Sequence, residues 1–180
     1  MKTKGVAVLQ QVTVQGGQSP VTYTYFDTEP EGKFALGLVY RPGGMRAAAG
    51  PAVVSHFGAV VWDAAAVSAY WERLGFPAFS MEHVTDKPLS LAFEVGYQRH
   101  TQFRYEWISP PPSPPNIYAD FLNKHHREGI QHIGMPVDDL ARSVAAYEKL
   151  GYHVRQGGAQ HAYMDTDSVG GISVELVQSH

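Results

Sequence analysis

Residues 130–152, IQHIGMPVDDLARSVAAYEKLGY, decide the fold, because the chain carries the same pattern a second time, 76 positions earlier. The shift needs no gap and superposes a histidine, a glycine, an aspartate and a Leu-Gly-aromatic ending: His132 on His56, Gly134 on Gly58, Asp139 on Asp63, Leu150 on Leu74, Gly151 on Gly75 and Tyr152 on Phe76. A constant offset over such a length is the signature of an internal repeat. The sequence therefore predicts two copies of one supersecondary unit.

Each copy predicts a buried strand followed by an amphipathic helix. The strands are the apolar runs of residues 54–61 and 130–137. Asp63 and Asp139 can then accept hydrogen bonds from the free amides of the first helical turn. Both helices carry apolar residues three and four positions apart, and each ends at a glycine suited to a left-handed backbone.

Three more strands follow each helix, so that each unit is expected to be βαβββ. In the second unit the strands lie near residues 153–156, 160–164 and 171–177. In the first unit a turn is expected at residues 96–100, between the second and third of its strands. The predicted strands of the first unit are residues 78–84, 89–95 and 101–108. The proline-rich segment 109–115 predicts an extended connector, and residues 116–126 predict a short helix after it.

The N-terminal region predicts strands without a long helix, and it echoes the C-terminus at an offset of 138 positions. Tyr25 falls on Tyr163, and the run 34–40 falls on 172–178. The chain is therefore expected to divide into three parts. These are residues 1–50, a helix-less three-strand half-module with a linker; residues 51–112, the first module; and residues 113–180, the connector helix and second module.

Composition excludes several classes of function. The chain has 180 residues, 44% hydrophobic, with a formal net charge of -3, so neither nucleic acid nor an anionic membrane is an expected partner. The absence of cysteine excludes disulfides, a thiolate nucleophile and Cys-ligated metal sites. No apolar run approaches the roughly 20 residues of a membrane span, so a cytoplasmic location is expected.

One histidine in the first strand and one glutamate in the last strand recur in both units. They are His56 with Glu106, and His132 with Glu175. A single such histidine is more often a core residue bonded to a carbonyl, and a single strand glutamate more often lies at an edge. The repetition of both types favours a shared site, because a divalent cation would compensate the cost of burying two carboxylates. His and Glu ligands suit zinc, cobalt, nickel, manganese and iron alike.

The pattern of H-x-G, capped helix ending L-G-aromatic, and strands ending in E-hydrophobic resembles the vicinal oxygen chelate superfamily, which includes lactoylglutathione lyase, methylmalonyl-CoA epimerase, extradiol dioxygenases and fosfomycin-type resistance proteins. The resemblance covers roughly residues 53–180, and residues 105–152 are most similar to the epimerase-like branch. It implies an α+β fold of the glyoxalase/bleomycin-resistance type, in which paired βαβββ modules form an open, cupped barrel around one divalent metal ion.

Carried over by position, the resemblance implies the metal ligands His56, Glu106, His132 and Glu175. It also implies that Glu175 detaches as a catalytic base, with Glu106 serving on the opposite face of the substrate. Two departures matter. Epimerases commonly have glutamine at the position of Glu106, and the N-terminal half-module has Gly37 where a ligand glutamate would fall.

Other polar and aromatic residues are weaker candidates. Arg104 shares a strand face with Glu106 and is a candidate to bind a substrate carboxylate or phosphate. An ion pair with Glu106 or a solvated position at the sheet edge is the simpler explanation of this arginine. His161 and Tyr163 share a face beside Glu175 and are candidates to line the cup. The three tryptophans are expected in the core or at the module interface: Trp62, Trp71 and Trp107.

These observations favour a metal-dependent epimerase, isomerase or glyoxalase-like lyase that stabilises the enolate of a carbonyl or acyl-thioester substrate. The alternatives are a non-catalytic protein that sequesters a small molecule in the same cup and an iron-dependent dioxygenase. The second carboxylate, Glu106, counts against the dioxygenase. The half-module exposes an edge and an apolar face, so it is expected either to pack on the complete modules of its own chain or to pair across a homodimer. A homodimer is the expected assembly.

Overall fold

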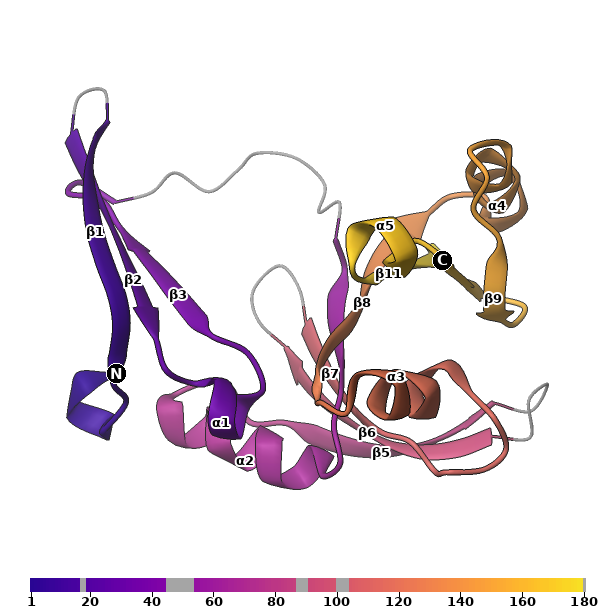
Figure 1. Ribbon diagram of the computed structural model, residues 1–180, viewed down its shortest axis with the longest axis horizontal. Coiled ribbons are helices and arrows are strands. Elements are labelled where there is room, and N and C mark those ends of the chain that lie inside the picture. Colours follow the sequence, from indigo (N-terminus) through magenta and orange to yellow (C-terminus); the bar gives the residue numbers. More distant parts are fainter. Residues whose placement is uncertain (17–18, 45–53, 87–90, 100–103, 180) are drawn as a thin grey trace. The chain divides into compact units, whose positions relative to one another are not determined.

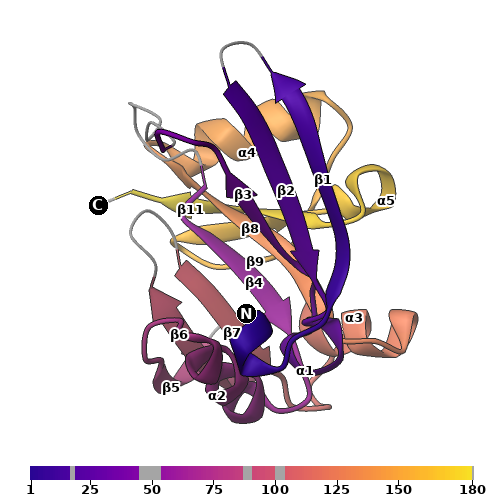
Figure 2. The same cartoon turned by 90° about the vertical axis from the view of Figure 1, so that its left-hand side faces the viewer.

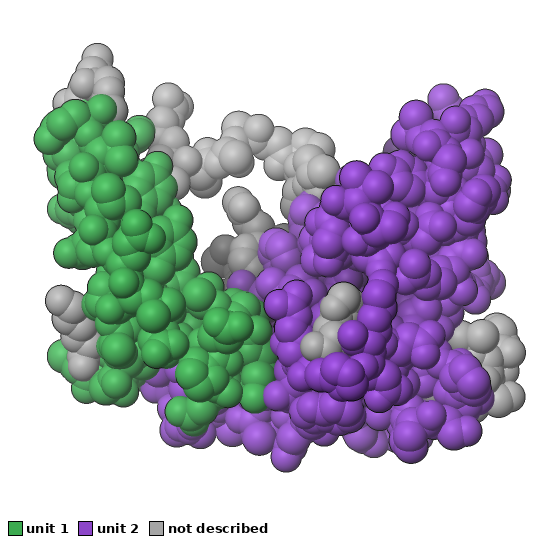
Figure 3. Space-filling model, viewed as in Figure 1, with its two compact units in different colours: residues 1–51 green, residues 52–180 purple. Residues whose placement is uncertain are grey.

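The computed structural model describes residues 1–16, 19–44, 54–86, 91–99 and 104–179. The chain forms two compact units, residues 1–51 and residues 52–180, which Figure 3 colours separately. Each is described by itself. Within the described residues, no helix is long and apolar enough to cross a membrane.

The second unit is built on one eight-stranded sheet in the order β5-β6-β7-β4-β8-β11-β10-β9, which curls into an open cup (Figures 1 and 2). In each half the first and last strands pair in parallel, β4 with β7 and β8 with β11, and β4 and β8 join the halves antiparallel. The strands are β4 (His56–Val60), β5 (Ser80–Asp86), β6 (Leu91–Arg99), β7 (Arg104–Ser109), β8 (Gly129–Val137), β9 (Val154–Gly157), β10 (His161–Met164) and β11 (Ser173–Gln178). This symmetric order confirms the predicted pair of βαβββ modules.

The two repeat helices, α2 (Ala64–Leu74) and α4 (Leu140–Lys149), begin and end as predicted. The Asp63 carboxylate accepts a hydrogen bond from the Ala66 amide, and the Asp139 carboxylate accepts one from the Arg142 amide, both at 2.9 Å. After the helices the backbone turns left-handed at Gly75, with φ of 99°, and at Gly151, with φ of 90°. Such caps satisfy amides and carbonyls that have no partner inside the helix.

Helix α2 packs against the outer side of β6 and β7. Trp71 of the helix stacks on Trp107 of β7 with ring centroids 6.2 Å apart, and both are fully buried, as predicted. The prediction for Trp62 was wrong, because its side chain is 64% exposed. Trp62 lies between the end of β4 and the Asp63 cap, where the chain has left the sheet and no layer covers it.

The turn predicted at residues 96–100 was also wrong over its described part, because β6 runs through Gly96 to Arg99. A Cβ atom at position 96 would lie 2.8 Å from the Ser68 hydroxyl of α2. The glycine is therefore explained by the close approach of the helix to the sheet rather than by a turn. His100 and residues 87–90 and 101–103 lie outside the described residues.

The connector helix α3 (Ile117–His125) packs on the inner face of the cup at one end. Asn116 caps it by accepting a hydrogen bond from the Ala119 amide at 2.8 Å. Its apolar side chains join a buried cluster with strand residues of both modules: Ile117, Tyr118, Leu122, Val60, Phe93, Val95, Ile108 and Tyr163. The helix therefore closes the apolar end of the cup, and the polar residues lie at the other end of the same strands.

The first unit is the predicted three-strand half-module, with strands β1 (Val8–Gly16), β2 (Ser19–Phe26) and β3 (Leu36–Tyr40) in one antiparallel sheet. Over residues 1–16 and 19–44 it forms no long helix; it holds the single turn α1 (Glu29–Gly32) and a 3-10 turn at Lys2–Lys4. The turn α1 corresponds to α5 (Asp167–Gly170) of the second unit.

The predicted echo between the half-module and the C-terminus extends to side-chain hydrogen bonds. The Thr28 hydroxyl donates to the Phe34 carbonyl at 2.7 Å and accepts from the Leu36 amide at 2.8 Å. The Thr166 hydroxyl makes the same two bonds, to the Ile172 carbonyl at 3.0 Å and from the Val174 amide at 2.9 Å. In register, Gly37 opposes Tyr25 as Glu175 opposes Tyr163, so the half-module has glycine at the glutamate position.

Candidate metal centre

The antiparallel pairing of β4 with β8 brings the two repeat histidines together. His56 lies opposite Gly134, and His132 lies opposite Gly58. Each ring occupies the space over the facing glycine: a Cβ at Gly58 would lie 1.8 Å from His132 Cε1, and one at Gly134 would lie 2.0 Å from His56 Cε1. The glycine of each H-x-G motif therefore makes room for the histidine of the other module.

The parallel strands then bring a glutamate beside each glycine. Glu106 of β7 lies opposite Gly58, and Glu175 of β11 lies opposite Gly134. Both carboxylates are buried, with 8% and 7% of their surface exposed. The repeat thus builds a pseudo-symmetric set of two histidines and two glutamates on the inner face of the sheet.

Three of these four residues form a compact cluster. The ligand atoms of His56, His132 and Glu175 all lie within 4.8 Å of one another. Glu175 Oε2 is 2.7 Å from His56 Nε2 and 3.6 Å from His132 Nε2. Among the described residues this is the one group of three or more His, Cys, Asp or Glu side chains close enough to share an ion.

Glu106 lies at the margin of the cluster because Arg104 engages it. Its Oε1 accepts a hydrogen bond from Arg104 Nε at 2.8 Å and forms an ion pair with Arg104 Nη2, also at 2.8 Å. The same oxygen lies 3.7 Å from His56 Nδ1. Arg104 also lies over the Tyr97 ring, 5.0 Å from its centroid. The fourth expected ligand is therefore close to the cluster but held in an ion pair.

The cluster fits a divalent cation better than it fits a closed network of the protein's own bonds. His132 Nε2 is buried and has no hydrogen-bond partner in the described part of the chain. Burial, outweighing the attraction of Glu175, lowers the pKa of His132 to about 4, so its imidazole is neutral near pH 7. A neutral imidazole nitrogen donates its lone pair to a metal ion, and a buried lone pair without a hydrogen-bond partner is available for this.

Glu175 supplies the negative charge. Burial alone would raise its pKa, but the hydrogen bond to His56 and the charges of His132 and His56 together lower it to about 2. Burial is also the largest influence on His56 and lowers its pKa, yet the hydrogen bond to Glu175 and the charges of Glu106 and Glu175 produce a net rise above 6.5. Without a cation, His56 and Glu175 form a buried ion pair.

Glu106 differs from Glu175 in its proton affinity. Burial, reinforced by the charge of Glu175, raises the pKa of Glu106 against the opposing effects of His56 and Arg104. Tyr97 lies opposite Glu106 across β6 and β7, and burial next to that carboxylate raises the pKa of its hydroxyl to about 12. The site therefore holds one strongly acidic carboxyl group and one that accepts a proton more readily.

Two members of the cluster, His56 and Glu175, line a pocket of about 500 Å³ together with Glu106, whereas the fully buried His132 is not part of its lining. Its walls are mostly apolar, and they include Val84, Phe93, Val95, Ile108 and Val177. Arg104, His161 and Tyr163, the three residues expected to bind substrate, all line it. The Tyr163 hydroxyl accepts a hydrogen bond from the Tyr118 hydroxyl at 2.8 Å and is only 4% exposed, so Tyr163 is also a core residue.

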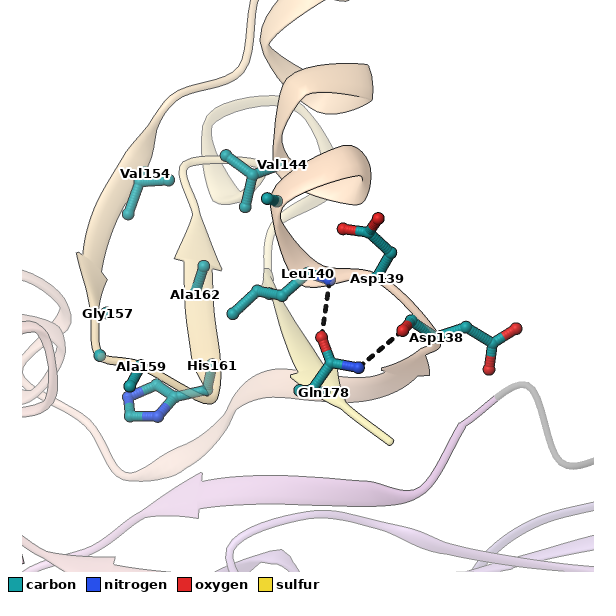
Figure 4. Close-up of a pocket in the computed structure, with 12 residues that line it drawn as sticks. Asp138, Asp139, Leu140, Val144, Val154, Gly157, Ala159, His161, Ala162 and Gln178 are labelled. Carbon is teal, nitrogen blue, oxygen red and sulfur yellow. Dashed lines mark hydrogen bonds between the residues drawn. The ribbon is translucent and has the colours of Figure 1, made fainter. Parts of the chain in front are cut away.

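A second pocket lies on the side of β10 that faces α4, and Figure 4 shows its lining. The Gln178 side chain accepts a hydrogen bond from the Leu140 amide at 2.8 Å and donates one to the Asp138 carbonyl at 2.7 Å (Figure 4). His161 lines both pockets. The second pocket has none of the clustered His and Glu residues in its lining, so it is separate from the candidate metal centre.

Sequence reasoning missed several residues of the site. Tyr97 was hidden by the incorrect turn at Gly96, and Tyr118 was treated only as part of a helix. Ser55 and Gln131, which precede the two histidines, contact the Nδ1 atoms at 3.0 Å and 2.7 Å. The offset of 76 positions that aligned the histidines also aligns these two residues, so the repeat itself contained the signal.

The comparisons agree with this geometry. The sequence matches the Glyoxalase/Bleomycin resistance protein/Dioxygenase superfamily over residues 55–178, and the chain belongs to this family. The family match and the cupped fold of paired βαβββ modules both assign the chain to the vicinal oxygen chelate superfamily. A search of curated proteins found no match.

Solved structures show the same fold at low sequence identity. A hypothetical protein of Bacillus halodurans has 20% identity and a TM-score of 0.56, covering 71% of this chain and 94% of its own. Methylmalonyl-CoA epimerase of Mycobacterium tuberculosis has 21% identity and a TM-score of 0.54, covering 76% and 93%. The Streptomyces coelicolor epimerase in complex with 2-nitronate-propionyl-CoA has 19% identity and a TM-score of 0.54, covering 70% and 93%.

Proposed function

We propose that this protein is a metal-dependent enzyme that forms and stabilises the enolate of a small carbonyl or acyl-thioester substrate, as an epimerase, an isomerase or a glyoxalase-like lyase. The observation that carries the proposal is the buried cluster of His56, His132 and Glu175, in which His132 Nε2 has no hydrogen-bond partner in the described part of the chain and His56 and Glu175 line a mostly apolar pocket. A site built only to sequester an apolar molecule gains nothing from burying such charges.

The two histidines and Glu175 would hold one divalent ion, of zinc, cobalt, nickel, manganese or iron. When bound, the ion would supply a Lewis-acid charge that favours the negative oxygen of an enolate. The chain's own residues would hold the substrate carbonyl next to the clustered side chains, and the apolar side chains of the pocket would keep water away from it.

Two carboxylates on either side of the cluster suit proton transfer at the carbon next to the carbonyl. The hydrogen bond and the ion-pair contact from Arg104 both go to Oε1 of Glu106, which leaves Oε2 to take up or return a proton. The raised pKa of Glu106 suits that role. Glu175, the second proposed base, would serve the opposite face. Return of the proton to the same carbon gives epimerisation, and return to the neighbouring carbon gives isomerisation.

The substrate is expected to be a mostly apolar acyl or ketone compound. A pocket of about 500 Å³ accepts a small molecule, and most of its lining side chains are aliphatic or aromatic. Two structural neighbours are described as complexes with 2-nitronate-propionyl-CoA and with methylmalonyl-CoA, which supports testing acyl thioesters first. Arg104 is the proposed contact for a polar end of the substrate, and His161 and Tyr163 are the proposed side wall.

Solvent deuterium exchange tests the proposal. Metal-reconstituted protein is incubated in deuterium oxide with a panel of acyl thioesters and ketones, and deuterium at the α-carbon is followed by NMR and mass spectrometry. Exchange is expected with at least one compound and should fall about 100-fold or more in Glu175→Gln and Glu106→Gln. Glu94→Gln changes an exposed carboxylate and should keep the wild-type rate. Exchange that persists in both site variants would contradict the assigned bases.

The competing function is a non-catalytic binding protein with the same cup. The ion pair of Glu106 with Arg104 favours it, because that pairing keeps one expected ligand away from a cation. Tight binding of apolar carbonyl compounds by metal-free protein, with no exchange after metal is added, would support this alternative.

A further inference from the structure

The residues directly before the two histidines, Ser55 and Gln131, make the same contact in both modules. Ser55 Oγ lies 3.0 Å from His56 Nδ1, and Gln131 Oε1 lies 2.7 Å from His132 Nδ1. A serine and a glutamine side chain have in common that each can both accept and donate a hydrogen bond. The same contact at equivalent positions of the repeat therefore points to a common role in orienting the imidazoles.

Each contact determines which nitrogen carries the hydrogen. The Ser55 hydroxyl donates its single hydrogen to the Gly134 carbonyl at 3.1 Å, so toward His56 Nδ1 it can only accept. Gln131 Oε1 is an amide oxygen and accepts, while its Nε2 points to the Ser173 hydroxyl at 3.5 Å. This arrangement makes Nδ1 the donor in both histidines, and both Nε2 atoms face Glu175. In metal-free protein the protonated His56 also donates from Nε2 to Glu175 Oε2, at 2.7 Å.

Burial makes this arrangement consequential. Gln131 is 4% exposed and His132 is fully buried, so loss of the Gln131 oxygen would leave a buried Nδ1–H without its partner in the protein. Gln131 also belongs to a chain of contacts, because Ser173 lies opposite His132 across β8 and β11. The glycine opposite each ring limits where the ring lies. The residue before each histidine, Ser55 or Gln131, determines which ring nitrogen carries the hydrogen and which has a lone pair for a metal ion.

We propose that Ser55 and Gln131 are positioning residues that hold the Nδ1–H of each histidine, so that the neutral His132, and His56 once its Nε2 proton has been displaced, present two Nε2 atoms to one cation beside Glu175. This inference rests on the proposed metal-binding function and adds to it the identity of the ligand atoms. Outer hydrogen bonds of this kind fix the orientation and basicity of metal ligands, and their loss weakens metal affinity about 10- to 100-fold.

The first test is the tautomer of His132 in metal-free protein, measured by long-range ¹⁵N–¹H NMR near neutral pH. Wild type is expected to carry the hydrogen on Nδ1 and none on Nε2. Gln131→Met removes the acceptor at similar volume and should produce a mixture of tautomers or a shift to Nε2–H. Gln131→Glu keeps an acceptor oxygen and should retain the Nδ1–H form, which keeps the test informative if the methionine variant does not fold.

The second test is the affinity for Co²⁺, followed by its visible absorption. Gln131→Met and Ser55→Ala should each bind about 10- to 100-fold more weakly than wild type. Ser55→Thr keeps the hydroxyl and should bind within about threefold of wild type. The matched controls are Gln156→Met, a buried glutamine that accepts from the Ile117 amide, and Ser109→Ala, a serine that accepts from the Ala64 amide. Both should leave Co²⁺ affinity unchanged.

Different results would overturn the proposed metal-binding function and the proposed positioning role of Ser55 and Gln131. Absence of Co²⁺ binding by wild type would overturn the metal function, whereas the tautomer of His132 in metal-free protein can still be measured. A proton on Nε2 of His132 in wild type would overturn the positioning role. So would a Gln131→Met variant whose tautomer and Co²⁺ affinity match those of Gln156→Met.

Discussion

At the residue scale, the glycine of each H-x-G motif is as necessary to the site as its histidine. Gly58 and Gly134 have ordinary backbone angles in this fold, so their role is spatial: each leaves room for the ring of the opposite module. This explains why the motif recurs as a pair. Neither glycine could be interpreted in this way until the register of β4 and β8 placed it against a histidine.

Gly134→Ala should therefore displace the His56 ring and weaken metal binding. The new Cβ would lie 2.0 Å from His56 Cε1, and relieving such an overlap in a packed interior costs about 1–3 kcal/mol. Thermal denaturation and Co²⁺ titration measure the two effects. Gly170→Ala is the control, because a Cβ there meets nothing within 4 Å. A Gly134→Ala protein with wild-type stability and affinity would contradict the packing described for the site.

The protonation of His56 gives the metal site a pH dependence. In metal-free protein the pKa of His56 is raised above 6.5 by Glu175 and Glu106 against the effect of burial, whereas His132, with a pKa of about 4, stays neutral. A cation must displace the proton of His56 only, so affinity should fall about tenfold per pH unit below the raised pKa and level off above it.

Co²⁺ titrations across the neutral range, with proton release measured in weak buffer, test this. Below the raised pKa, about one proton should leave per ion bound. Glu106→Gln removes one of the charges that raise the pKa of His56, so the fall in affinity should begin at a lower pH. An affinity independent of pH, or a wild-type and variant with the same profile, would count against the ion pair of His56 with Glu175.

At the scale of the elements, the two repeat helices depend on the aspartates that cap them. Asp139→Ala removes the acceptor for the Arg142 amide and should destabilise the protein by about 0.5–2 kcal/mol in denaturant unfolding. The cap lies outside the cup, so Co²⁺ affinity should stay at the wild-type value. Asp139→Asn keeps an oxygen and should recover most of the stability; failure to recover would assign the effect to charge rather than to capping.

Much of the element structure was predictable, because local signals and the repeat agreed with each other. The Asp63 and Asp139 caps, the left-handed Gly75 and Gly151 and the connector helix all occur where the sequence placed them. Gly96 was misinterpreted because a glycine in a strand has two explanations, a turn or a close neighbour, and only the position of α2 distinguishes them. Trp62 was misplaced because hydrophobicity alone does not show where a chain leaves its sheet.

The candidate site was predictable in its residues but only partly in its pairings. The repeat identified both histidines and both glutamates, and β-strand alternation placed Arg104 on the face of Glu106. The ion pair of Arg104 with Glu106, two positions apart on one strand, was among the sequence-based alternatives and is confirmed. The pairing of Glu175 with His56 could not be predicted, because that distance depends on how the two modules pack together. The comparisons establish the family and leave the reaction as a proposal.

At the scale of the whole molecule, the N-terminal half-module presents exposed apolar side chains in its own sheet. Leu38 is 46% exposed, Val39 43% and Tyr40 65%, all on β3. We expect a homodimer that covers them, since a three-stranded sheet without its helix is a poor independent fold. Light scattering should give twice the chain mass, and Leu38→Glu should shift it toward monomer while Co²⁺ affinity is kept. A wild-type monomer with a protease-labile N-terminus would contradict this.

The measurement that tests the central claim most directly is metal content by plasma mass spectrometry on tag-free protein after exposure to several divalent ions. We predict about one equivalent of a transition metal per chain, lost in His132→Ala and in Glu175→Ala while circular dichroism shows the fold intact. His83→Ala and Glu94→Ala are matched controls, because these residues form an exposed His–Glu pair at 2.7 Å, the same distance that joins His56 and Glu175. Protein that takes up no ion, or variants that retain it, would contradict the metal centre.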